Sequence, residues 1–161
     1  LDRDTTGLTI VAKHALAGGI LGNAVAKRAI HRTYYAVCSG CTPACMRISA
    51  PIARKDASTI ERCVDFKRGE NAVTDFIRIK YNPDNNLSLV KLRLLTGRTH
   101  QIRVHMKYIG FPLIGDFLYN PDYTYISRQA LHSGRLVFTH PVTGQKMNLI
   151  SDIPSDMKSL F

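Results

Sequence analysis

The chain has 161 residues, of which 45% are hydrophobic and 21% are charged, and its formal net charge is +10. This composition is typical of one folded domain and excludes a fibrous or largely disordered protein. No run of residues approaches the ~20 apolar positions of a membrane-spanning helix, and the first residues do not resemble a signal peptide, so we expect a cytoplasmic protein without a membrane partner.

The first half of the chain predicts three strands and one helix. Residues 7–12 are apolar, as in a short buried strand, and the alanine-rich residues 15–30 favour a helix despite three glycines. Residues 33–37 are rich in Thr, Tyr and Val, which is typical of a strand. Residues 59–66 are a further candidate strand.

Two alternating segments predict a β-hairpin. In residues 77–81 and 90–94, apolar side chains alternate with Lys and Arg, so each segment is expected to be a strand with one buried face. Residues 82–86 between them are turn formers. The expected buried face of the first strand consists of Ile77, Ile79 and Tyr81.

A helix is expected after Gly97, with Thr99 as its cap and its end at Gly110. At ~100° per residue, its apolar and basic side chains fall on opposite faces. The apolar face would hold Ile102, Met106 and Ile109, and the basic face His100, Arg103 and Lys107. Two more strands (136–139 and 145–150) and a last short helix (155–161) predict, with the rest, an α+β fold with a mixed, largely antiparallel β-sheet and a few packed helices.

Four cysteines, Cys38, Cys41, Cys45 and Cys63, raise the question of a metal site. A structural zinc needs four ligands, usually as two pairs, and the crowded spacing of the first three fits this poorly. Reduced structural thiols are the favoured interpretation, and a metal or a disulfide is the alternative. Cys38 ends an apolar run, where a small buried residue is expected.

The basic residues lie largely in stretches without acids. Residues 5–55 and 87–115 contain no Asp or Glu, although Lys and Arg recur in both. Lys and Arg on one face displace counterions from phosphates, so a polyanionic partner is the natural interpretation. The alternative is a basic surface without a partner.

Three features of the sequence are candidate catalytic or binding groups. Asp2 is a carboxylate on a polar loop before an expected strand, although a solvated surface turn is the alternative. Residues 97–103 turn into a helix start with two arginines and a histidine, which either attracts anions or forms a solvated basic face. Tyr34 offers a ring for stacking on a base and a hydroxyl for proton transfer, but a tyrosine in a strand is more often plain core.

The sequence lacks the motifs of several other enzyme classes. It has no Gly-rich phosphate loop, no His-Glu-x-x-His helix and no Gly-x-Ser-x-Gly elbow. Nucleotide-driven, zinc-protease and α/β-hydrolase chemistry are therefore not expected.

Several segments resemble the motifs of RluA-type RNA pseudouridine synthases, in that family's order and along essentially the whole chain. The long central motif is matched almost word for word and is highly specific. The matching segments are residues 1–8 (LDRDTTGL), 32–37 (RTYYAV), 95–105 (LTGRTHQIRVH), 110–116 (GFPLIGD), 128–132 (RQALH) and 138–141 (FTHP).

The resemblance implies a pseudouridine synthase fold and the isomerisation of specific uridines in structured RNA, either ribosomal or transfer RNA. It assigns Asp2 as the nucleophilic carboxylate, Tyr34 as the active-site tyrosine and Arg103 as the arginine that pairs with the aspartate. Leu131 would form an apolar wall against the uracil. The further candidates for substrate binding are Arg3, Thr6, Arg98, His100 and Gln101.

The implied chemistry calls for no metal, redox cofactor or nucleotide, because the bond broken and the bond made have similar energies. An ionised Asp in a closed pocket needs a cation beside it, since desolvation would otherwise raise its pKa. Arg is suitable because it keeps its charge and binds a carboxylate through two hydrogen bonds. The carboxylate could attack C1′ of the ribose, as in retaining glycosidases, or add to the base.

The chain departs from the family pattern at its start, because the expected His-Arg pair before Leu1 is not present. We therefore expect residues 1–161 to be a single catalytic domain from a longer protein, and we expect a monomer. Arg32 replaces a Lys of the family, and Thr6 replaces a Ser. The alternatives to an enzyme are a non-catalytic RNA-binding domain with an incomplete site, and a protein-interaction module with a merely basic surface.

Overall fold

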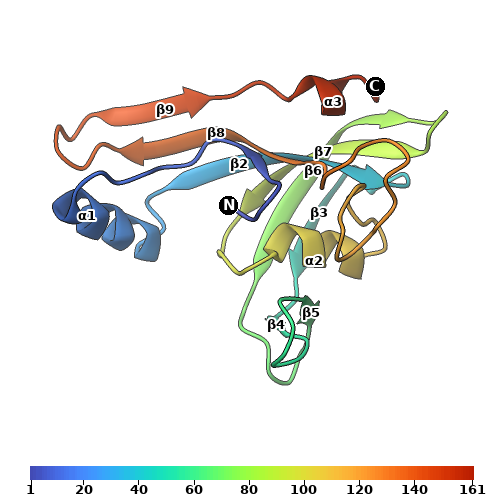
Figure 1. Ribbon diagram of the computed structural model, residues 1–161, viewed down its shortest axis with the longest axis horizontal. Coiled ribbons are helices and arrows are strands. Elements are labelled where there is room, and N and C mark those ends of the chain that lie inside the picture. Colours follow the sequence, from blue (N-terminus) through green and yellow to red (C-terminus); the bar gives the residue numbers. More distant parts are fainter.

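The computed structural model describes all 161 residues as a seven-stranded sheet, a two-stranded sheet and three helices (Figure 1). The elements in chain order are β1 (Thr6–Gly7), α1 (Ala15–Ala26), β2 (His31–Ser39), β3 (Cys45–Ser49), β4 (Ile52–Arg54), β5 (Arg62–Val64), β6 (Val73–Asn82), β7 (Leu87–Leu94), α2 (Gln101–Tyr108), β8 (Leu131–Thr139), β9 (Lys146–Ile150) and α3 (Ser155–Lys158). None of the helices is long and apolar enough to cross a membrane.

The large sheet has the strand order β1-β8-β2-β7-β6-β3, and β9 pairs with β8. Only β1 and β8 run parallel, and the other pairs are antiparallel. The predicted α+β class with a mixed, largely antiparallel sheet is therefore confirmed. The predicted helix over residues 15–30 ends at Ala26, and only Arg62–Val64 of the predicted strand over residues 59–66 forms.

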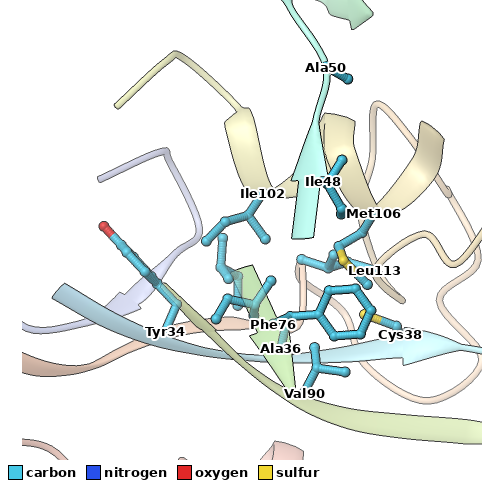
Figure 2. Close-up of a cluster of buried hydrophobic side chains, with 12 residues drawn as sticks. Tyr34, Ala36, Cys38, Ile48, Ala50, Phe76, Val90, Ile102, Met106 and Leu113 are labelled. Carbon is cyan, nitrogen blue, oxygen red and sulfur yellow. The ribbon is translucent and has the colours of Figure 1, made fainter. Parts of the chain in front are cut away.

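The main core lies between α2 and one face of the sheet (Figure 2). Ile102 and Met106 of α2 pack there in one cluster with Ala36 of β2, Phe76 of β6 and Val90 of β7. The β4–β5 hairpin extends from the sheet on the same side as α2 (Figure 1). This side of the sheet is therefore the one on which side chains from distant segments converge.

The predicted buried face of β6 is wrong. Ile77 and Ile79 are each 49% exposed, whereas Thr74 and Phe76 are buried. The register pairs Phe76 with Leu92 under α2 and Ile77 with Lys91, and a bulge follows between Arg78 and Lys80. Because side chains alternate along a strand, this register places Ile77 on the outer face of the sheet.

The predicted buried strand over residues 7–12 is also wrong. Only Thr6 and Gly7 pair with β8, and Val11 is 79% exposed. The reason is competition for one edge: β9 pairs with β8 from Arg135 onward and leaves no backbone partner there for the residues after Leu8. The loop of Asp2 is therefore held by a strand of two residues.

Helix α2 begins and is buried differently from the expectation. Its N-cap is His100 instead of Thr99, with a left-handed φ of 57° and no side-chain cap. Its expected basic face is solvated only in part, because Lys107 is exposed whereas Arg103 is 1% exposed and buried among neighbours. Gly110 ends the helix as predicted, with a φ of +86° that favours glycine.

The four cysteines carry free thiols, and no three His, Cys, Asp or Glu side chains form a group that could hold a metal ion. Cys38 is fully buried in the main core, as predicted, and burial raises its pKa. Cys41 and Cys45 are exposed. The Arg78 guanidinium contacts the Cys41 sulfur at 2.6 Å.

His105 ties α2 to the sheet and is fully buried. Its Nδ1 lies 2.8 Å from Thr74 Oγ1, and its Nε2 lies 2.9 Å from the backbone oxygen of Ala50. Burial lowers the pKa of His105, although the hydrogen bond to Ala50 opposes this. Burial is also the main cause of the lowered pKa of His100 and of His132.

We expect the Tm to fall as the pH drops below about 6.5, the ordinary pKa of histidine. In that range the unfolded chain takes up protons on these histidines while the folded chain resists, so acid favours unfolding. The measurement is Tm between about pH 7.5 and pH 5, compared with His105→Gln, which cannot titrate and should flatten the curve. Asp65, whose pKa is lowered from 3.8 by hydrogen bonds, contributes only at still lower pH. An equally steep curve in the variant would contradict this assignment.

Candidate active site

The loop that carries Asp2 is fixed by residues far along the chain. The Gln129 side-chain amide donates to the backbone oxygen of Arg3 at 3.1 Å and to Thr5 Oγ1 at 2.6 Å. Gly7 has a φ of +102°, and a Cβ there would stand 2.3 Å from the backbone oxygen of Ser133, so this position requires glycine. The loop thereby acquires a defined path although it has little regular structure.

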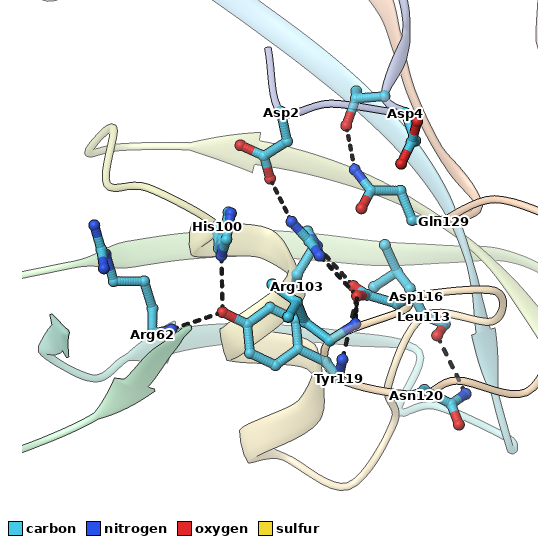
Figure 3. A network of polar contacts seen from close by, with 12 residues as sticks. Asp2, Asp4, Arg62, His100, Arg103, Leu113, Asp116, Tyr119, Asn120 and Gln129 are labelled. Carbon is cyan, nitrogen blue, oxygen red and sulfur yellow. Dashed lines mark hydrogen bonds and ion pairs between the residues drawn. The ribbon is translucent and has the colours of Figure 1, made fainter. Parts of the chain in front are cut away.

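Arg103 of α2 lies between two carboxylates (Figure 3). Its Nε and Nη2 donate to Asp116 Oδ2 and Oδ1, both at 2.7 Å, and its Nη1 donates to Asp2 Oδ2 at 3.1 Å. The side chains of Arg103 and Asp116 are 1% and 0% exposed, whereas that of Asp2 is 24% exposed. Asp116 therefore anchors the guanidinium and leaves one nitrogen for a carboxylate that still reaches solvent.

The positive charge of Arg103 is well supported. Burial alone would lower its pKa, but hydrogen bonds to Asp116 and then to Asp2 outweigh this effect and raise the pKa. The guanidinium carbon also lies 5.0 Å from the ring centre of Tyr119 and 5.5 Å from that of Phe117, a cation–π geometry. Asp2 thus faces a cation with a fixed position.

Asp2 borders a small pocket of about 80 Å³ between the N-terminal loop, β2, the end of β7 and the start of α2. Leu94 and Ile102 give it an apolar wall. The structure brings most of the expected site residues together here, namely Asp2, Tyr34, Arg98, His100, Gln101, Arg103 and Leu131.

Tyr34 packs its ring in the main core, and its hydroxyl points out of that cluster (Figure 2). The residue is 8% exposed. Burial raises the pKa of Tyr34, the nearby Asp2 raises it further, and Arg32 opposes both. The phenol therefore keeps its proton near pH 7 and suits hydrogen bonding better than proton abstraction.

The protonation of His100 follows from its partner Tyr119. The Tyr119 hydroxyl accepts the backbone N–H of Arg62 at 2.9 Å and lies 2.9 Å from His100 Nδ1 (Figure 3). Burial raises the pKa of Tyr119 to about 12, so its hydroxyl keeps its proton and can donate it to Nδ1. Burial and Arg103 lower the pKa of His100. This favours a neutral imidazole with its proton on Nε2.

Some expected site residues have other contacts. Arg3 pairs with Asp4 and its side chain is 77% exposed, outside the pocket. Thr6 also lies outside it, with Oγ1 2.9 Å from His132 Nδ1. Gln101 lines the pocket, but its amide bonds Thr74, the Val73 backbone oxygen, Thr96 and the Arg98 N–H, so it shapes the loop before α2.

Sequence reasoning gave no role to Asp116, Tyr119 or Gln129. Asp116 is the last residue of the matched segment 110–116. A buried arginine calls for an acidic partner, so this carboxylate could have been found once Arg103 was known to be buried. Nothing in the local sequence marks Tyr119. Gln129 lies in a matched motif without a chemical clue to its bonds with the N-terminal loop.

Comparisons with known proteins identify the family of this chain. A family model described as RNA pseudouridylate synthase matches residues 1–108. Human RNA Pseudouridylate Synthase Domain Containing 1 is similar in structure, with a TM-score of 0.82 and 26% identity, over 94% of this chain and 66% of that one.

Curated relatives match the whole chain. The Bacillus subtilis protein "Uncharacterized RNA pseudouridine synthase YjbO" is 47% identical over 100% of this chain and 56% of its own length. "Ribosomal large subunit pseudouridine synthase D" of Zymomonas mobilis is 37% identical over 100% of this chain and 53% of its own length. The chain thus spans about half the length of the curated relatives it matches. By its sequence and its fold, it belongs to the RNA pseudouridylate synthase family.

Proposed function

We propose that the protein isomerises uridine to pseudouridine in RNA, with the Asp2 carboxylate as nucleophile. The observation that carries the proposal is the 3.1 Å contact between Asp2 and the buried Arg103, in a pocket shared with Tyr34 and Leu131. Relatives named for the large ribosomal subunit support ribosomal RNA as the substrate, and transfer RNA is the alternative.

In this reaction the bond between N1 and C1′ of uridine breaks and a bond between C5 and C1′ forms. The proton leaves C5 and N1 regains one, so atoms balance without a cofactor. Arg103 orients the Asp2 carboxylate for attack at C1′ or at the base, and Leu131 offers an apolar surface to the uracil. The Tyr34 ring stacks on the flipped base, and the neutral His100 donates its Nε2–H to an oxygen of the bound nucleotide.

The full chain is tested with a ribosomal RNA transcript that carries tritium at C5 of uridine. The proposal expects release of tritium into water together with formation of pseudouridine. RNA binding without tritium release would instead favour a non-catalytic RNA-binding domain. We further propose that residues 1–161 act as one catalytic domain, as a monomer in the cytoplasm. The seven-stranded sheet, which contains both the first strand (β1) and the last strand (β9) of the chain, supports the single domain.

Two replacements of Tyr34 should distinguish the contribution of its ring from that of its hydroxyl. Tyr34→Phe is expected to keep RNA affinity, because the stacking surface remains, while Tyr34→Ala should lose about 1–3 kcal/mol of binding free energy. Single-turnover rates and Kd values are measured for both variants. Equal Kd values for Phe and Ala would show that the ring does not stack on the base.

A further inference from the structure

A second hollow, of about 410 Å³, lies next to the active-site pocket, between the β4–β5 hairpin and the loop before α2. Four arginines and one acid line it: Arg54, Arg62, Arg68, Arg98 and Glu70. Arg98 lines both this hollow and the active-site pocket, so the two hollows border each other at that residue. We call the hollow the arginine groove.

Two of the four arginines have no acidic partner. Arg98 pairs with Glu70, and Arg68 pairs with Asp65 at 2.8 Å. In contrast, the only side-chain hydrogen bonds of Arg54 and Arg62 go to backbone oxygens, at 3.3 Å and 3.4 Å. Such long contacts leave most of the guanidinium donors free for another acceptor.

The same two arginines stand directly opposite each other in the β4–β5 ladder. Like charges at directly opposed positions destabilise a strand pair. The residues next to this pair, just beyond the two strands, have opposite charges, since Lys55 pairs with Glu61 at 2.9 Å. The hairpin therefore keeps a repulsive pair that a bound anion would relieve.

The arginine groove is fixed to the active site. The backbone N–H of Arg62 donates to the Tyr119 hydroxyl, which in turn contacts His100 at the edge of the pocket (Figure 3). Val64 of β5 packs partly buried against the clusters that contain Ile102 and Val104 of α2. An anion on Arg54 and Arg62 would consequently sit at a set position from Asp2.

We propose that the arginine groove binds backbone phosphates of the RNA strand that adjoins the target uridine. The proposal rests on the proposed function, because it needs an RNA nucleotide in the pocket. The guanidinium fork matches phosphate oxygens, and because both hollows border Arg98, a phosphate next to the bound nucleotide is the natural anion. The groove thereby adds affinity for the bound strand without taking part in the reaction at Asp2.

The opposite face of the sheet supplies a matched control. It has a hollow of about 440 Å³ lined by Lys91, Arg93 and Arg135 among others, and Arg93 and Arg135 are exposed. Leu92, which neighbours Arg93, is buried under α2, so Arg93 points away from the pocket. These arginines add to the net charge but lie on the face of the sheet opposite the active-site pocket.

The test compares Arg54→Gln/Arg62→Gln with Arg93→Gln/Arg135→Gln in the full chain. Kd for a ribosomal RNA transcript is measured against KCl concentration, together with the rate of tritium release at saturating RNA. We expect the groove variant to bind about tenfold or more weakly and to lose about 1–2 units of the salt slope, with an unchanged saturating rate and an unchanged or higher Tm. The control should differ little from wild type, and Arg54→Lys/Arg62→Lys should keep the slope.

Three outcomes overturn the inference. Equal losses in the groove and control variants would mean that only net charge matters. An unchanged salt slope would mean that Arg54 and Arg62 touch no phosphate. A lower Tm with a lower saturating rate would assign the pair a structural role. If wild type binds RNA but releases no tritium, the proposed reaction fails, and the salt slopes still decide on the groove.

Discussion

Asp2→Asn is expected to lower the single-turnover rate of tritium release by about 10⁴-fold or more while Kd for RNA changes little. Asn keeps the shape of the side chain but cannot act as an anionic nucleophile. Because Asp2 is 24% exposed and is not the main anchor of Arg103, the fold should survive the change.

Asp4→Asn is the matched control for this experiment. Asp4 lies two residues away, pairs with the exposed Arg3 and has a left-handed φ of 68°, which Asn tolerates. It removes the same charge from the same loop and should leave the rate unchanged. Comparable activity of Asp2→Asn and wild type would remove Asp2 from the mechanism.

Asp116→Ala is expected to destabilise the chain by about 3–5 kcal/mol, because it leaves the guanidinium of Arg103 buried with only one partner. It also removes the carboxylate acceptor of the Leu118 N–H and one of the two acceptors of the Tyr119 N–H, which keeps the backbone oxygen of residue 116. Urea unfolding measures the loss, and tritium release should fall as well, since Arg103 no longer has a fixed position.

Asp75→Ala tests whether burial of the ion pair causes the loss of stability expected for Asp116→Ala. Asp75 makes a similar two-bond contact with Arg47, at 2.6 Å and 2.8 Å, but the arginine side chain is 64% exposed. Removal of an exposed pair should cost no more than about 1 kcal/mol. Arg103→Met/Asp116→Leu should recover part of the stability lost in Asp116→Ala without recovering activity. A cost for Asp116→Ala as small as that of Asp75→Ala would contradict the anchoring role.

The sequence predicted the sheet well where local pattern and tertiary register agree. In β7, Val90 and Leu92 are buried and Lys91 is exposed, as alternation requires. In β6 the same alternation is present, but the partner strand decides which set faces α2, and Ile77 follows Lys91 outward. One chain's pattern cannot show that choice, because it depends on the register between two strands.

The candidate site was likewise predicted only in part. Motif resemblance brought Asp2, Tyr34 and Arg103 into one hypothesis, and the structure places all three at one pocket. Whether they act as assigned remains a prediction. Periodicity placed Arg103 on a basic face, and only the packing of Asp116 and Tyr119 around it explains its burial.

Because β1 has only two residues, the position of Asp2 depends on contacts that form late in folding. The contacts that place Asp2 join residues far apart in sequence, 101 positions for Arg103 and 124 for the bond between Gln129 and Thr5. Contacts of such long range form only after loop entropy has been overcome by the rest of the fold. A partly folded chain can therefore hold its sheet while Asp2, the proposed nucleophile, is not yet in place, and we expect catalysis to be recovered only in the last step of refolding.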